Sequence, residues 1–126
     1  MSRPGIYITQ GSYGEAWAIQ ILDGLGQPVD LTDATGILFS MRLRSSGVVH
    51  ISDQPAEVAI GTYTLPDGSV QTFAATDGVL VYRPKSADGD ADVAGAFEAM
   101  FRYSLPTGSV GKPGLGYLNI HIQAAF

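Results

Sequence analysis

The most regular alternation of hydrophobic and polar side chains lies in residues 93–105. Successive side chains of an extended chain point to opposite faces, so hydrophobic residues at every second position form a buried face. The hydrophobic face of this segment carries Phe97, Ala99, Phe101, Tyr103 and Leu105, and the opposite face carries Glu98, Arg102 and Ser104. The pattern predicts a half-buried β-strand, which we interpret as the central strand of a sandwich.

Shorter segments with the same period occur along the rest of the chain. They predict strands at residues 6–9, 16–22, 37–44, 78–83 and 116–122, a hairpin partner beginning at 48–51, and weaker candidates at 57–60 and 61–65. The first of these is expected at a sheet edge, and the second places Trp17 on its inward face. Glycine and proline predict turns at 23–28, 45–47, 67–68 and 106–109, and a loop at 112–114.

Short strands separated by turn signals at intervals of roughly 8–12 residues are typical of β-sandwiches. Because the chain contains no cysteine, its fold cannot include a disulfide. No segment has a sustained helical period, and neither a repeat nor a linker divides the chain. We therefore predict an all-β protein, an Ig-like antiparallel β-sandwich of about seven to eight strands that forms a single domain over residues 1–126.

Composition narrows the function classes. The net charge of −5 and the pI near 4.6 argue against proteins that bind nucleic acids or anionic membranes through phosphate contacts. No hydrophobic run approaches the roughly 20 residues of a membrane helix, and residues 1–5 lack the apolar core of a secretory signal. We expect a protein made in the cytosol that binds neither nucleic acid nor membrane.

The ionisable residues do not form a recognisable catalytic motif. Asp88, Asp90 and Asp92 alternate as in a calcium loop, but the required glycine and glutamate positions hold Val93 and Ala99. A solvated acidic turn is the preferred interpretation, and weak metal binding there is left open. His50 and His121 are interpreted as surface residues. The expectation is a protein without enzymatic activity or cofactor.

Several outward-facing residues are candidates for protein contacts. Arg42 and Arg44 on one strand and Arg102 on another could form a cationic stripe, although cross-strand pairing with residues such as Glu98 is favoured. Aromatic residues near edges and ends often anchor protein interfaces. The further candidates are Tyr7, Tyr13, Phe126 and, in the loop at 109–114, Lys112.

Several motifs taken together resemble one protein family. They are QGSYG at residues 10–14, DG at 23–24, GQPVDLTDAT at 26–35 leading into ILFSMR at 37–42, VAGAFEAMF at 93–101 and GYLNIHI at 116–122. This set is similar to the N-terminal Ig-like domain of tailed-phage baseplate upper proteins and to related small virion proteins. The resemblance covers nearly the whole chain, which looks like the attachment module without the C-terminal adaptor region of the larger members.

The resemblance implies a structural protein of the tailed-phage virion, in the baseplate, the neck or attached to the head. Such a protein would dock as symmetric copies onto other virion proteins, and it would be located in the virion after synthesis in the host cytoplasm. The alternative is a receptor- or glycan-binding module for host adhesion, in which Tyr13, Tyr63, Asp88 and Asp90 could contact a sugar.

Overall fold

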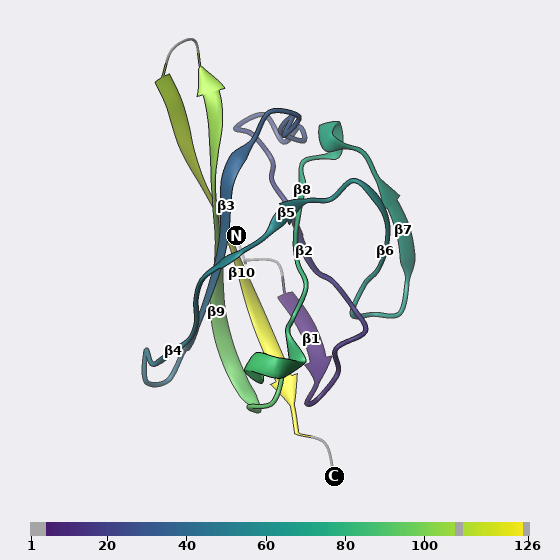
Figure 1. Cartoon of the computed structure of the whole chain (residues 1–126), viewed down its shortest axis with the longest axis vertical. Helices are drawn as coiled ribbons and strands as arrows, with labels where there is room; N and C mark the ends of the chain where they lie inside the picture. The colour runs from purple at the N-terminus through teal and green to yellow at the C-terminus, as the bar shows by residue number, and fades with distance from the viewer. Residues whose placement is uncertain (1–4, 108–109, 125–126) are drawn as a thin grey trace.

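The computed structural model describes residues 5–107 and 110–124, with side chains given outside 106–115. In these residues the chain forms ten strands, drawn in Figure 1. They are β1 (Gly5–Thr9), β2 (Trp17–Gln20), β3 (Thr35–Leu43), β4 (Val49–Pro55), β5 (Glu57–Val58), β6 (Gly61–Thr64), β7 (Val70–Phe73), β8 (Val79–Tyr82), β9 (Gly95–Thr107) and β10 (Val110–Gln123). Single 3-10 turns at Ala75–Asp77 and Ser86–Asp88 are the helical segments of this part of the chain.

Eight of these strands form two facing sheets. The larger sheet has the order β1-β10-β9-β3-β4, the smaller has the order β2-β8-β5, and β6 pairs with β7 as a separate hairpin. If β2, β3, β4, β5, β8, β9 and β10 are equated with Ig strands B, C, C′, D, E, F and G, both sheets have the strand order of an Ig variable-type sandwich. The predicted all-β, Ig-like sandwich is thus confirmed.

One pairing departs from the predicted antiparallel arrangement. Strand β1 runs parallel to β10, with Gly5 beside Asn119 and Thr9 beside Gln123. Parallel neighbours need a long connection between them, and here almost the whole chain supplies it. The predicted edge position of β1 is confirmed, because β1 is the end strand of the large sheet.

Aromatic side chains fill the space between the sheets. Trp17 from the small sheet and Phe39 and Phe101 from the large sheet are almost fully buried, as predicted from their strand phases. The Phe39 ring stacks on Tyr82 at 4.3 Å and lies 4.9 Å from Phe101. These contacts join both sheets, because Tyr82 belongs to β8 of the small sheet.

The strand predicted to be central occupies the middle of the large sheet. Phe97 and Phe101 of β9 are fully buried, and β10 and β3 flank this strand. Gly95, at its start, has a φ of +151° and would place a Cβ atom 3.1 Å from the Leu43 side chain. Glycine therefore allows the chain to pass close to Leu43 as it enters β9.

The prediction of a turn at 106–109 followed by a loop at 112–114 is wrong in extent. Strand β9 continues to Thr107, and β10 begins at Val110, with Lys112 beside Leu105 and Pro113 beside Ser104. A proline is tolerated in a strand that has a partner on one side, and β1 pairs with β10 from Asn119 onward. The β9–β10 hairpin extends beyond the rest of the large sheet at the top of Figure 1.

Candidate interaction surface

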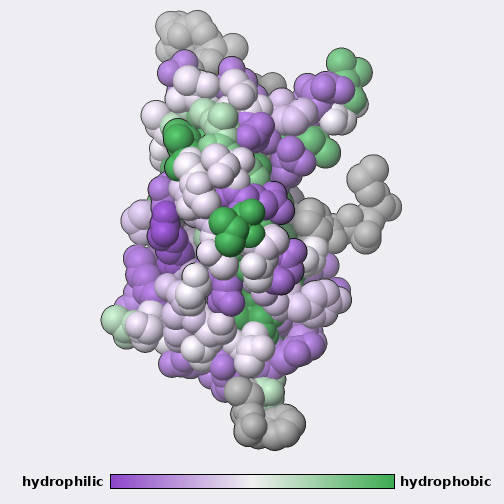
Figure 2. All heavy atoms as spheres, turned by 90° about the vertical axis from the view of Figure 1, so that its right-hand side faces the viewer, coloured by the Kyte–Doolittle hydropathy of each residue, from purple (hydrophilic) through white to green (hydrophobic). Residues whose placement is uncertain are grey.

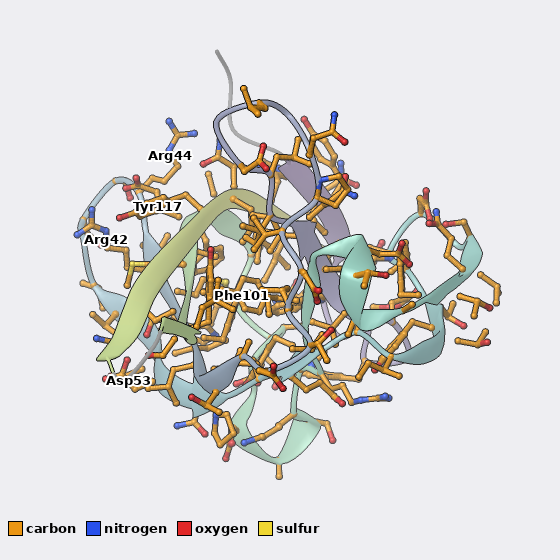
Figure 3. The ribbon with its side chains drawn as sticks, turned by 90° about the horizontal axis from the view of Figure 1, so that it is seen from above. Arg42, Arg44, Asp53, Phe101 and Tyr117 are labelled. Atoms are coloured by element: carbon orange, nitrogen blue, oxygen red, sulfur yellow. The ribbon has the colours of Figure 1, made fainter. Side chains whose placement is uncertain are left out.

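The large sheet turns one side away from the small sheet, and we call this side the outer face. It carries every second residue of β1, β3, β9 and β10. In β4 two register shifts against β3 place Val49 and Asp53 on this face while Ile51 between them is buried. Its members include Tyr7, Ser40, Arg42, Arg44, Val49, Asp53, Glu98, Met100, Arg102, Tyr117, Asn119 and His121. Figure 3 shows Arg42, Arg44 and Tyr117 outside the sheet and Phe101 on its inner side.

One row of the outer face joins four strands through directly opposed residues. Asn119 lies opposite Glu98, Glu98 opposite Arg42, and Arg42 opposite Val49. The Arg42 guanidinium lies 3.6 Å from the Glu98 carboxylate, and its side chain is 58% exposed. The predicted cross-strand pairing of Arg42 is therefore confirmed, and such an exposed pair contributes little stability.

Arg102 pairs with a residue that the sequence reasoning did not name. Its Nη2 atom donates to the carboxylate of Asp53, at an irregularity of β4. Asp53 has a φ of +48°, and its backbone N–H donates to Ser40 Oγ over 2.9 Å. Ser40 Oγ also donates to Asp53 Oδ1 over 3.1 Å, so β3 and β9 both hold this bulge in place.

Hydrophobic side chains surround a shallow hollow at the centre of the outer face. The hollow has a volume of about 310 Å³ and is lined by Val49, Met100 and Tyr117 together with the Arg42–Glu98 pair. Val49 is 59% exposed and Tyr117 is 43% exposed. In contrast, hydrophobic residues appear as separate spots among hydrophilic ones on the side that carries β6 and β7 (Figure 2).

A second hollow, of about 360 Å³, lies at the β1 edge of the same face. Tyr7 and Arg44 contribute to its lining. The Tyr7 ring is 5.8 Å from the ring of His121, and Tyr7 is 70% exposed. Arg44 has no ion-pair partner among the described side chains. An aromatic ring and an unpaired guanidinium are thus both accessible to a partner.

The structure brings three of the six candidate contact residues together. Tyr7, Arg42 and Arg44 share the outer face, whereas Tyr13 lies elsewhere, beside the loop that follows β8. The backbone of Lys112 belongs to β10, but its side chain and the whole of Phe126 lie outside the described residues.

The loop after β8 closes around a buried carboxylate. Asp90 is 3% exposed, and its Oδ2 atom accepts hydrogen bonds from the Tyr82 hydroxyl and from the Lys85 backbone N–H at 2.8 Å. Burial, followed by the hydrogen bond to Asp90, raises the pKa of Tyr82 far above its ordinary value. The His50 ring lies 3.0 Å from the Asp90 carbonyl oxygen, so this imidazole has a structural partner.

Tyr13 has a structural contact in the same loop. Its hydroxyl donates to Asp92 Oδ1 at 2.7 Å and accepts from the Ala91 backbone N–H at 2.9 Å. Burial and the bond to Asp92 raise the Tyr13 pKa. Tyr13 therefore fixes the loop to the segment between β1 and β2.

The three alternating aspartates do not converge. Asp88 is exposed, Asp90 is buried, and Asp92 binds Tyr13. Among the residues that the structure describes, no group of three or more acidic, histidine or cysteine side chains is placed to hold a metal ion. Tyr63 and Asp90, which the glycan-binding hypothesis places at the surface, are both buried.

Sequence reasoning missed the hydrophobic part of the outer face. Met100, Tyr117 and Val49 line the central hollow, yet none was selected as a candidate. For Met100 the available signal was its phase, because it lies between the outward residues Glu98 and Arg102. Val49 had no such signal, because it shares the phase of buried Ile51. A large hydrophobic residue on the polar phase of an amphipathic strand marks an exposed hydrophobic side chain.

No protein-family model matches this chain, and no curated protein matches it either. In the described part of the chain, no helix has the length and hydrophobicity needed to span a membrane.

Proposed function

We propose that this protein is a structural component of a tailed bacteriophage virion that docks through protein–protein contacts. Two lines of reasoning support this role. The GQPVDLTDAT and VAGAFEAMF motifs resemble those of baseplate upper proteins, and the chain folds into the Ig-like sandwich that the resemblance implies.

The observation that carries the proposal is the composition of the outer face. Exposed Tyr7, Val49 and Tyr117 lie there together with arginines, and protein interfaces are enriched in aromatic residues and arginine. A sheet face of this composition is typical of a site of protein association.

The proposed role is non-enzymatic and requires no cofactor. The partners would be other virion proteins and further copies of this chain, in the baseplate, neck or head-attached region. Symmetric copies hold each other by multivalency, so a domain of this size can remain in a particle through contacts that are individually weak.

Mass spectrometry of purified particles tests the proposal. Particles from a phage that encodes the chain should contain it in a fixed ratio to the other structural proteins, and the chain should stay bound during density-gradient purification. Particles with a disrupted gene, mixed with purified free protein before the gradient, serve as the control for carry-over. Absence of the chain from intact particles would refute the virion role.

The glycan-binding alternative has less support from the geometry. Of the four side chains it requires, Tyr63 and Asp90 are buried, and the Tyr13 hydroxyl is bonded to Asp92. We therefore propose the structural role alone, and binding to a host polysaccharide on a glycan array would reopen the alternative.

A further inference from the structure

The turn between β2 and β3 presents an exposed hydrophobic tip. Leu25 is 87% exposed, the largest exposed fraction among the large hydrophobic residues described, and Leu22 at the base of the turn is 52% exposed. An exposed leucine is common on protein surfaces, but this one is held on a well-ordered support.

Side-chain and backbone hydrogen bonds support the tip. Asp23 Oδ1 accepts from the backbone N–H groups of Leu25 at 2.8 Å and Gln27 at 3.0 Å. The Asp23 N–H donates to the Gln27 carbonyl at 2.8 Å, and Leu22 forms a bridge with Pro28. Little conformational entropy would be lost when such a preformed tip binds a partner.

The surroundings of the tip are acidic. The connection bonds to the segment after β7, since the Leu31 N–H donates to the Ala75 carbonyl at 3.0 Å. Residues 21–35 and 74–78 contain Asp23, Asp30, Asp33 and Asp77 and no lysine or arginine. The tip therefore belongs to a connection whose charged side chains, together with that of Asp77 in the bonded segment, are all carboxylates.

The outer face has the complementary composition. Its described side chains include three arginines and two carboxylates, whereas the whole chain has seven basic and twelve acidic side chains. Its central hollow is lined by Val49, Met100 and Tyr117 and by the Arg42–Glu98 pair, and the Arg42 side chain of that pair is 58% exposed. The hollow offers a hydrophobic site for an apolar side chain and cations for the carboxylates around it.

We infer that the β2–β3 turn of one copy docks on the outer face of the next, with Leu25 in the central hollow and the acidic surroundings facing Arg42 and Arg44. The inference rests on the proposed function, which requires contacts between copies. The turn lies at the upper end of the molecule and the outer face on the left in Figure 1, so one copy can use both surfaces at once. Such a head-to-tail contact generates rings or open assemblies.

Three aspartate variants test the contact by sedimentation equilibrium. Leu25→Asp alters the tip, Val49→Asp alters the hollow, and Val70→Asp is the matched control, because Val70 on β7 is 63% exposed and Val49 is 59% exposed. The wild type and the control should self-associate with concentration, and each of the other two should do so at least about tenfold more weakly, equivalent to about 1.4 kcal/mol. Circular dichroism and thermal unfolding check that each variant folds.

Mixing the two defective variants gives the decisive result. Leu25→Asp keeps an intact hollow and Val49→Asp keeps an intact tip, so one contact can still form between them. The mixture should yield a one-to-one dimer that grows no further, although each variant alone stays monomeric. A contact symmetric between two outer faces would instead leave Leu25→Asp self-associating.

Each other outcome overturns the inference. It fails if the folded wild type stays monomeric up to about 1 mM, if Val70→Asp impairs association as strongly as the test variants, or if the mixture contains no dimer. A monomeric chain that is still found in purified particles would reject this contact and retain the virion role. A head-to-tail oligomer that is absent from particles would retain this contact and reject the virion role.

Discussion

At the scale of single residues, two positions set the local geometry. Asp90 is a buried carboxylate that joins the end of β8 to the following loop through Tyr82 and Lys85. Gly78, directly before β8, has a φ of +72° at a point where the β2–β3 connection passes close to its backbone. Because the surroundings constrain both residues, substitutions at Gly78 and at Tyr82, the partner of Asp90, should change the stability of the fold in specific ways.

Stability should decline in alkali through Tyr82. An unfolded tyrosine ionises near pH 10, whereas burial and Asp90 keep the folded Tyr82 protonated to higher pH. The stabilisation is fully present below pH 10 and is lost as pH rises further, by about 1.4 kcal/mol per pH unit. Urea unfolding between about pH 8 and 11 should show a shallower decline for Tyr82→Phe than for the wild type. Equal slopes would contradict the assignment.

Gly78→Ala should destabilise the fold more than Gly68→Ala. Both glycines have positive φ, but a Cβ at Gly78 would lie 2.8 Å from the Ile21 carbonyl oxygen and 2.9 Å from the Val29 nitrogen, whereas Gly68 has open space. The conformational cost common to both is about 1–2 kcal/mol. Chemical denaturation should show an additional loss for Gly78→Ala, and equal losses would mean that the connection moves aside freely.

At the scale of elements, the β6–β7 hairpin differs from the large sheet. Its two strands pair with each other, and its buried residue Tyr63 belongs to a small cluster with Ala16, Ala59, Val79 and Val81. The central strand β9 instead has a partner on each side and belongs to the main core. The hairpin should therefore open without unfolding of the whole sandwich.

Native-state hydrogen exchange tests this difference. Amides of Tyr63 and neighbouring hairpin residues should exchange through local opening, whereas those of Phe39 and Phe101 should require global unfolding. The hairpin amides should then be insensitive to low urea concentrations, and the β9 amides should respond with the global slope. Uniform protection in both regions would show that the hairpin unfolds only with the core.

The sequence predicted the elements that have a strict two-residue period. Phe97 and Phe101 in β9, Phe39 in β3 and Trp17 in β2 are all buried on the predicted faces. The sequence did not predict β7, because the residues of this strand are mostly exposed and lack alternation. It also did not predict the extension of β10 through Pro113, where backbone pairing with β9 outweighs the turn preference of glycine and proline.

The outer face was predictable only in part. Arg42 and Glu98 could be paired because both occupy the outward phase of strongly patterned strands. The hollow between Val49, Met100 and Tyr117 depends on which strands are neighbours. Periodicity gives the face on which a side chain lies but carries no information on sheet order, so this site required the structure.

At the scale of the whole molecule, charge is unevenly distributed. Arginines are concentrated on the outer face, although the chain has a net charge of −5. The β2–β3 connection contains Asp23, Asp30 and Asp33, and the segment bonded to it contains Asp77. In the proposed contact, the arginines of the outer face attract the acidic β2–β3 turn of a neighbouring copy. Because these charges are at the surface, dissolved salt screens the attraction.

Self-association should weaken as salt is added. The Debye length falls from about 10 Å at 0.1 M to about 3 Å at 1 M ionic strength, which screens Arg42 and Arg44 from an approaching acidic turn. The dissociation constant measured by sedimentation should rise severalfold across this range in the wild type and in Val70→Asp. An association that is indifferent to salt would show that these charges do not contribute.

The parallel pairing of β1 with β10 also constrains the order of events during synthesis. Strand β1 is made before the other strands of its sheet, yet Ile8 cannot reach its buried position until its partner Ile122 is available. The central hollow likewise needs Tyr117 from β10 beside Met100 from β9. A ribosome-bound chain that has not reached β10 therefore lacks this surface, and growing chains on one messenger cannot join each other through it before each has completed its own sheet.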